Sequence, residues 1–111
     1  MSAIKVYVAG AHGGPLDLRE KLRQQNGVEL VWDGSAAEVV LYALDDGPLH
    51  RDRVRGLAAS SAAPVVLAAR RADANLLDQA LEADVADILL LPESPERIMF
   101  SLRKAARTAT R

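Results

Sequence analysis

The chain has 111 residues, a length that suits one domain with one hydrophobic core. Its 14 basic and 15 acidic residues leave a net charge of −1, which gives no electrostatic basis for binding nucleic acid or an anionic membrane. Because it has no cysteine and no apolar run of about 18 residues, we expect a cytoplasmic protein without disulfides or membrane insertion.

A strand and a helix are predicted in the first quarter of the chain. The β-rich run over 4–9 predicts the first strand. Pro15 is suited to the first turn of the helix that follows, where its missing N–H costs nothing. Asn26-Gly27 ends this helix, with Gly27 as its left-handed cap.

The connection between the second and third strands is short. Val28, Leu30 and Trp32 alternate as the second strand, and the third begins by Val39. Only about five residues remain between the two strands, too few for a full crossover helix. We therefore predict that the second helix is short or missing, and that sheet surface is exposed near Trp32, Val39 and Leu41.

The middle of the chain continues the alternation. Asp45-Asp46-Gly47-Pro48 predicts a turn after the third strand, and 65–69 predicts a fourth strand. Asp73 is a candidate N-cap for the next helix, whose apolar stripe includes Leu77 and Leu81.

A strand and a long helix complete the pattern. The continuous apolar run over 88–91 predicts a strand that is covered on both faces. Ser94 and Pro95 are a candidate N-cap and first-turn proline for a helix that runs to about Arg107. Strands that alternate with helices favour an α/β fold, here a five-stranded parallel sheet in the flavodoxin-like order 2-1-3-4-5.

One segment resembles a known family. The stretch over 80–92, ALEADVADILLLP, is similar to the "ALEAGADDYLxKP" pattern of response-regulator receiver domains. The resemblance implies a receiver-like domain over 1–107, with 108–111 as a tail or linker stump. It also implies where a phosphorylation site would lie. The acidic pair of receivers aligns with Ala9-Gly10-Ala11 and the phosphoacceptor with Ala43, while the switch hydroxyl aligns with Ala68 and the lysine with Leu91.

In this alignment, the receiver-like fold lacks the side chains that phosphorylation requires. Phosphoryl transfer needs carboxylates for a metal, a nucleophile and cations for the developing charge. Apolar residues or glycine stand at all four positions, so we expect no metal, no cofactor and no enzymatic activity. The segment 89–92 and Arg103-Lys104-Ala105 are also similar to the atypical N-terminal receiver domain of Tad-type, ParA/MinD-like pilus-assembly ATPases. That resemblance implies a role in protein interaction and localisation.

Two alternative sites remain open. Asp45 and Asp46 are the acids that follow the third strand, so a shifted register would make Asp45 a phosphoacceptor; otherwise they form a turn. The loop with Gly10, His12, Gly13 and Gly14 precedes a helix N-terminus and could bind an anion or nucleotide through its N–H groups. Glycine-rich loops are more often only turns, and His12 is expected to be solvated.

A protein interface is the preferred functional hypothesis. On the last helix, Ile98 and Leu102 share the core face while Phe100 points away among basic side chains. An aromatic side chain surrounded by basic groups is a frequent interface composition. We predict a homodimer, or docking to another protein, through the last two helices. The predicted interface residues are Leu77, Leu81, Glu82, Phe100, Arg103, Lys104 and Arg107.

Overall fold

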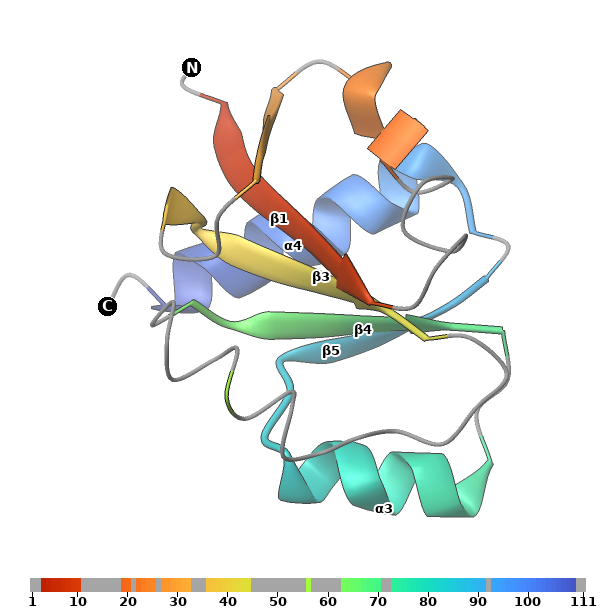
Figure 1. Cartoon of the computed structure of the whole chain (residues 1–111). Helices are drawn as coiled ribbons and strands as arrows, with labels where there is room; N and C mark the ends of the chain where they lie inside the picture. Colours follow the sequence, from red (N-terminus) through yellow and green to blue (C-terminus); the bar gives the residue numbers. More distant parts are fainter. Residues whose placement is uncertain are drawn as a thin grey trace.

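The computed structural model describes residues 3–10, 19–20, 22–25, 27–32, 36–44, 56, 63–70, 73–91 and 93–109. Five strands form one sheet in the order β2-β1-β3-β4-β5, and every neighbouring pair is parallel (Figure 1). The strands are β1 (Ile4–Gly10), β2 (Val28–Val31), β3 (Val39–Ala43), β4 (Val65–Ala69) and β5 (Asp87–Leu90). The predicted flavodoxin-like order is confirmed.

Helices cover both faces of the sheet. On one face, α4 (Pro95–Ala109) packs through Ile98 and Leu102 against Val6, Val39 and Val66. On the other face, α3 (Ala74–Glu82) packs through Ala80 against Tyr42 and Leu67. Alternate strand residues point to opposite faces, so β3 and β4, buried along their whole length, contribute to both cores.

Side-chain caps fix the beginnings of both helices. Asp73 Oδ1 accepts a hydrogen bond of 2.8 Å from the Leu76 amide at the start of α3. Ser94 Oγ accepts one of 3.3 Å from the Arg97 amide at the start of α4. Each bond satisfies an amide that has no partner within its helix. Both predicted N-caps are confirmed.

Two residues with positive φ end helical segments. Gly27 has φ of 88° just before β2, as predicted for a left-handed cap. Asp84 has φ of 58° after α3, where the Asp84 and Val85 amides donate to the carbonyls of Leu81 and Ala80. This is the Schellman arrangement, which usually carries glycine at the left-handed position.

The short connection between β2 and β3 is also present. Trp32, Ala37 and Glu38 are not helical. A helix between Trp32 and Ala37 could therefore contain at most four residues. Two helical turns take about seven residues, so the prediction that the second helix is short or missing is confirmed. The expected exposure is only partly correct. Trp32 is 80% exposed beyond the end of the outermost strand, but Val39 and Leu41 are completely buried because they lie on a central strand and pack beneath α4.

Candidate functional site

The carboxyl edge of the sheet is apolar where receiver domains carry their reactive groups. Gly10 at the end of β1 lies beside Ala43, and Ala43 lies beside Ala68. The Leu91 amide donates to the Ala69 carbonyl at 2.7 Å, which places Leu91 at the same edge. Ala43 is 2% exposed and Ala68 is completely buried. These side chains have no group that can bind a metal, accept a phosphoryl group or donate a proton.

The remaining predicted site residues at this edge are not placed. Asp45, Asp46, His12, Gly13 and Gly14 lie outside the described residues. Among the residues that the structure describes, no three His, Cys, Asp or Glu side chains gather closely enough to hold a metal ion. Within the same residues, no helix is both long and apolar enough to span a membrane.

A groove of about 430 Å³ runs between α3 and β5. Leu77 and Leu81 line it from α3, and Ile88 lines it from β5. Leu81 is 79% exposed, so most of its side chain faces solvent. The groove therefore brings together two of the predicted interface residues, and Glu82 follows them at the exposed end of the helix.

The outer face of α4 carries the aromatic side chain. Phe100 is 58% exposed, and the Arg97 guanidinium carbon lies 5.7 Å from the centre of its ring. Lys104 and Arg107 are exposed on the same helix. Phe100 therefore lies outside the core, as the helical spacing predicted.

Arg103 lies apart from this group. Its Nη2 is 2.5 Å from the position that a Cβ on Gly27 would occupy, just before β2. Because β2 and β5 form opposite edges of the sheet, Arg103 projects away from the α3 groove. The seven predicted interface residues therefore do not all share one surface.

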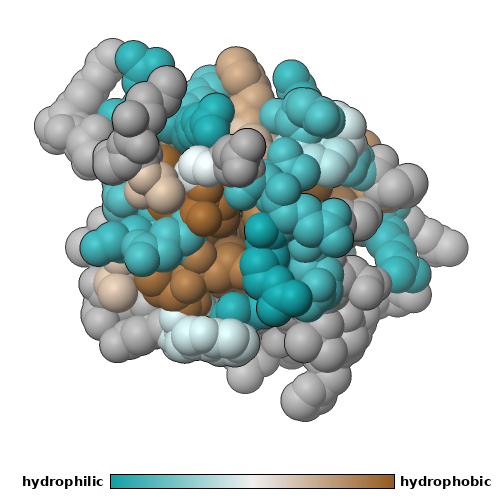
Figure 2. All heavy atoms as spheres, turned by 90° about the horizontal axis from the view of Figure 1, so that it is seen from above, coloured by the Kyte–Doolittle hydropathy of each residue, from teal (hydrophilic) through white to brown (hydrophobic). Residues whose placement is uncertain are grey.

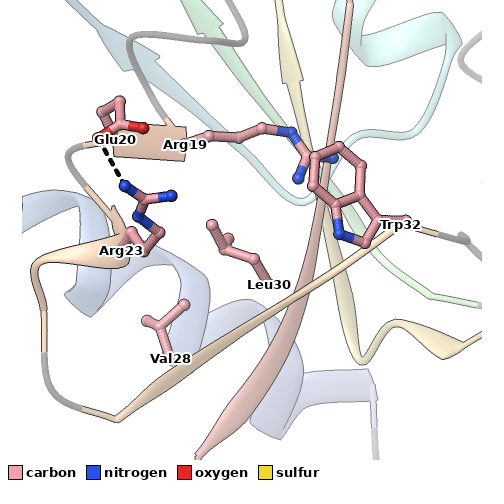
Figure 3. Close-up of a pocket in the computed structure, with 6 residues that line it drawn as sticks. All are labelled: Arg19, Glu20, Arg23, Val28, Leu30 and Trp32. Carbon is pink, nitrogen blue, oxygen red and sulfur yellow. Dashed lines mark hydrogen bonds and ion pairs between the residues drawn. The ribbon is translucent and has the colours of Figure 1, made fainter.

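A second groove, not anticipated from the sequence, lies between the first helical segment and β2. It has a volume of about 650 Å³ and is lined by Arg19, Glu20, Arg23, Val28, Leu30 and Trp32 (Figure 3). The Arg19 guanidinium carbon lies 3.9 Å from the centre of the Trp32 ring, and Arg19 Nη2 donates to the Val8 carbonyl at 3.3 Å. Arg23 and Glu20 form an exposed ion pair of 3.3 Å.

Comparison with known proteins bears on the fold. No protein-family model and no curated protein matches the sequence. Among solved structures, the receiver domain of a modulated diguanylate cyclase from Desulfovibrio desulfuricans superposes with a TM-score of 0.77 and 15% identity, covering 98% of each chain. The chain has the response-regulator receiver fold.

Two further structures with the receiver fold come from proteins described as pilus-assembly components. A pilus assembly-related protein from Burkholderia pseudomallei matches with a TM-score of 0.71 and 18% identity over 94% of this chain and 90% of its own. The pilus assembly protein CpaE2 from Sinorhizobium meliloti matches with 0.58 and 17% over 92% and 99%. At these identities the similarity concerns the fold.

The receiver fold explains why the second groove was missed. Arg19 and Trp32 come from different elements, and only the parallel pairing of β2 with β1 brings them together. The one available signal was Trp32 itself, a large aromatic residue at the end of a strand with no helix predicted to cover it.

Proposed function

We propose that this chain is a non-enzymatic protein-interaction module that uses the receiver fold without phosphorylation. The observation that supports the proposal is the apolar carboxyl edge, where Ala43 and Ala68 are buried beside Gly10. A phosphoacceptor carboxylate works there only beside a bound divalent cation and a cation that neutralises the new charge. The side chains at the matching positions offer neither.

A role in pilus assembly, on the cytoplasmic side, is the setting we propose. Two matched structures are of pilus-assembly proteins, and the receiver fold is shared with them. The module would act as a localisation or docking unit, either alone or as the N-terminal part of a pilus-assembly ATPase. Any nucleotide hydrolysis would then lie outside these 111 residues.

Phosphorylation can be tested directly. We expect no phosphoryl adduct by intact mass spectrometry after incubation with acetyl phosphate and magnesium. The matched control is the double variant Asp45→Asn plus Asp46→Asn, because these are the acids that a shifted register would use. A stoichiometric adduct on the unchanged chain that disappears in the double variant would show instead a working phosphoacceptor.

The docking surface that we propose is centred on the α3 groove. Leu77 and Leu81 form an apolar stripe on α3 beside Ile88 of β5. Leu90, on the same strand as Ile88, is half-exposed. A second copy could place its α4, with Phe100 and the basic Lys104, against this stripe and the acidic Glu82. A specific dimer of this kind should bury on the order of 1,000 Å² or more in total.

Leu81→Glu tests this surface. The substitution puts a charge into the groove without disturbing the core, because the side chain is mostly exposed. We expect at least about tenfold weaker self-association, since burying an unpaired carboxylate costs more than 1.4 kcal/mol, or about tenfold in affinity. Sedimentation equilibrium measures the strength of self-association. Asn75→Glu changes another exposed residue of α3, outside the groove lining, and should have little effect. A chain that stays monomeric at high concentration would exclude the homodimer.

A further inference from the structure

In the part of the chain that the structure describes, no strand pairs with the outer edge of β2. The Ile4 amide donates to the Gly27 carbonyl at 3.0 Å, and Ile4 lies beside Val28 in the parallel pair. In a parallel ladder, alternate residues of a strand bond to one neighbour, so Gly27, Glu29 and Val31 face β1. Val28 and Leu30 therefore direct their N–H and C=O groups away from β1. Within the described sheet, β2 is an outermost strand, so these groups are available to an added strand.

Apolar side chains lie next to this free edge. Val28 and Leu30 form the floor of the 650 Å³ groove, between Arg23 at one end and Trp32 at the other (Figure 3). Seen from the β2 side of the molecule, hydrophobic surface is visible near the centre and is bordered by hydrophilic residues (Figure 2). An extended chain beside β2 would place every second side chain over this floor.

Trp32 is held in position at the end of the groove. Arg19 stacks on the indole at 3.9 Å and is itself tied to the Val8 carbonyl. The indole nevertheless remains 80% exposed. A large aromatic side chain fixed before binding loses little conformational entropy on contact, and Trp and Arg are the residue types that dominate binding surfaces.

The charges around the groove favour an acidic partner. Arg19 and Arg23 line it, and Arg103 reaches Gly27 just before β2, while Glu20 is the one acid among the described residues that line the groove. Glu20 is already paired with Arg23. The Arg23 side chain is 71% exposed, so its guanidinium can also reach a carboxylate of a partner. A second copy in β2–β2 pairing would instead bring two arginine-rich rims together.

We infer that β2 and its groove bind an extended, acidic segment of a partner protein, which adds as a strand beside β2 and places apolar side chains over Val28 and Leu30. This surface is distinct from the proposed α3 docking surface, because β2 and β5 are opposite edges of the sheet. The inference therefore stands or falls independently of the proposed function.

The single tryptophan of the chain provides the readout. An eight-residue peptide that alternates Asp and Val is titrated into the protein while the emission of Trp32 is recorded. We expect a saturable shift of the emission to shorter wavelength as the exposed indole becomes covered. The same peptide with Lys in place of Asp should give no shift. An Asp–Val peptide N-methylated at alternate residues, which cannot form strand hydrogen bonds, should also give none.

Charge reversal locates the site. Arg23→Glu should weaken binding of the Asp–Val peptide about tenfold, because an attractive exposed contact becomes a repulsive one. Arg97→Glu is the matched control on α4, outside the groove, and should bind as the unchanged chain does. Thermal unfolding should confirm that both variants remain folded.

Four results with added peptide or oligonucleotide would overturn the inference. These are no saturable shift with the Asp–Val peptide, equal binding of the Asp and Lys peptides, equal loss in both arginine variants, and tighter binding of an eight-nucleotide oligothymidylate. A shift that depends on protein concentration without peptide would assign the edge to a second copy and would also contradict it.

Discussion

Gly27 is the residue at which backbone conformation and side-chain packing constrain the sequence together. Its φ of 88° is accessible to glycine at no steric cost, whereas it costs other residues about 1–2 kcal/mol. The Arg103 guanidinium also occupies the space that a Cβ would need. The same residue therefore fixes both the entry into β2 and the position of Arg103 against that edge.

Gly27→Ala should lower the free energy of unfolding by about 1–2 kcal/mol from the backbone, and little more from Arg103, because its guanidinium is the end of a flexible, exposed side chain that can move aside. Adding Arg103→Ala should therefore recover little of the loss, because it leaves the backbone strain in place. Urea denaturation measures both. Gly56→Ala is the matched control, since Gly56 is helical, exposed and has open space around it; it should stabilise by about 0.5–1 kcal/mol. Equal losses at both glycines would contradict this account.

Some residue-scale features were readable from the sequence and others were not. The caps Asp73, Ser94 and Gly27 were predicted because their chemistry is local. Asp84 occupies the position of the glycine in the receiver pattern, and that alignment could have indicated its positive φ. The position of Arg103 could not be predicted, because a helical wheel shows which side chains leave the core but not which sheet edge they approach.

At the scale of elements, a buried polar contact joins α4 to β5. Ser101 Oγ donates to Asp87 Oδ2 at 2.6 Å, and Ser101 is almost completely buried among apolar residues of α4. Asp87 Oδ1 also accepts from the Ile88 amide at 2.8 Å. One carboxylate therefore fixes the start of the strand and orients the helix above it.

Asp87→Ala should lower the free energy of unfolding by about 1–3 kcal/mol, because it leaves the buried Ser101 hydroxyl without an acceptor. Ser101→Ala should cost less, since the half-buried carboxylate can still be reached by water. In the double variant the loss should be smaller than the sum of the two single losses, as measured by chemical denaturation. Strictly additive losses would show that the two side chains do not act as a pair.

The elements and their order were predictable because they depend on patterns within the sequence. Five apolar runs separated by turns and helical stripes were sufficient for the strand order. The burial of Val39 and Leu41 was not predictable in the same way, because it depends on which elements cover the central strand. Val40 and Tyr42, which point to the opposite face of β3, are buried as well.

At the scale of the whole molecule, the two grooves and the carboxyl edge of the sheet are separate. The two grooves lie at β5 and β2, on opposite edges of the sheet, whereas Gly10, Ala43 and Ala68 meet at the carboxyl ends of the strands. The apolar residues at the carboxyl edge therefore do not interrupt the fold or either groove. This separation supports the proposal that the chain acts as an interaction module.

Ala43→Asp tests whether the carboxyl edge retains any latent metal site. The new carboxylate would be almost completely buried beside Gly10 and Ala68, so the free energy of unfolding should fall by more than about 3 kcal/mol. Ala36→Asp, at an exposed position, should change it by less than about 0.5 kcal/mol. Chemical denaturation of both variants with and without millimolar magnesium chloride shows whether the ion binds at this edge and stabilises the fold. Magnesium should rescue neither variant, because one carboxylate among apolar side chains cannot hold the ion. Rescue of Ala43→Asp alone would show that other acids of the chain complete a metal site there.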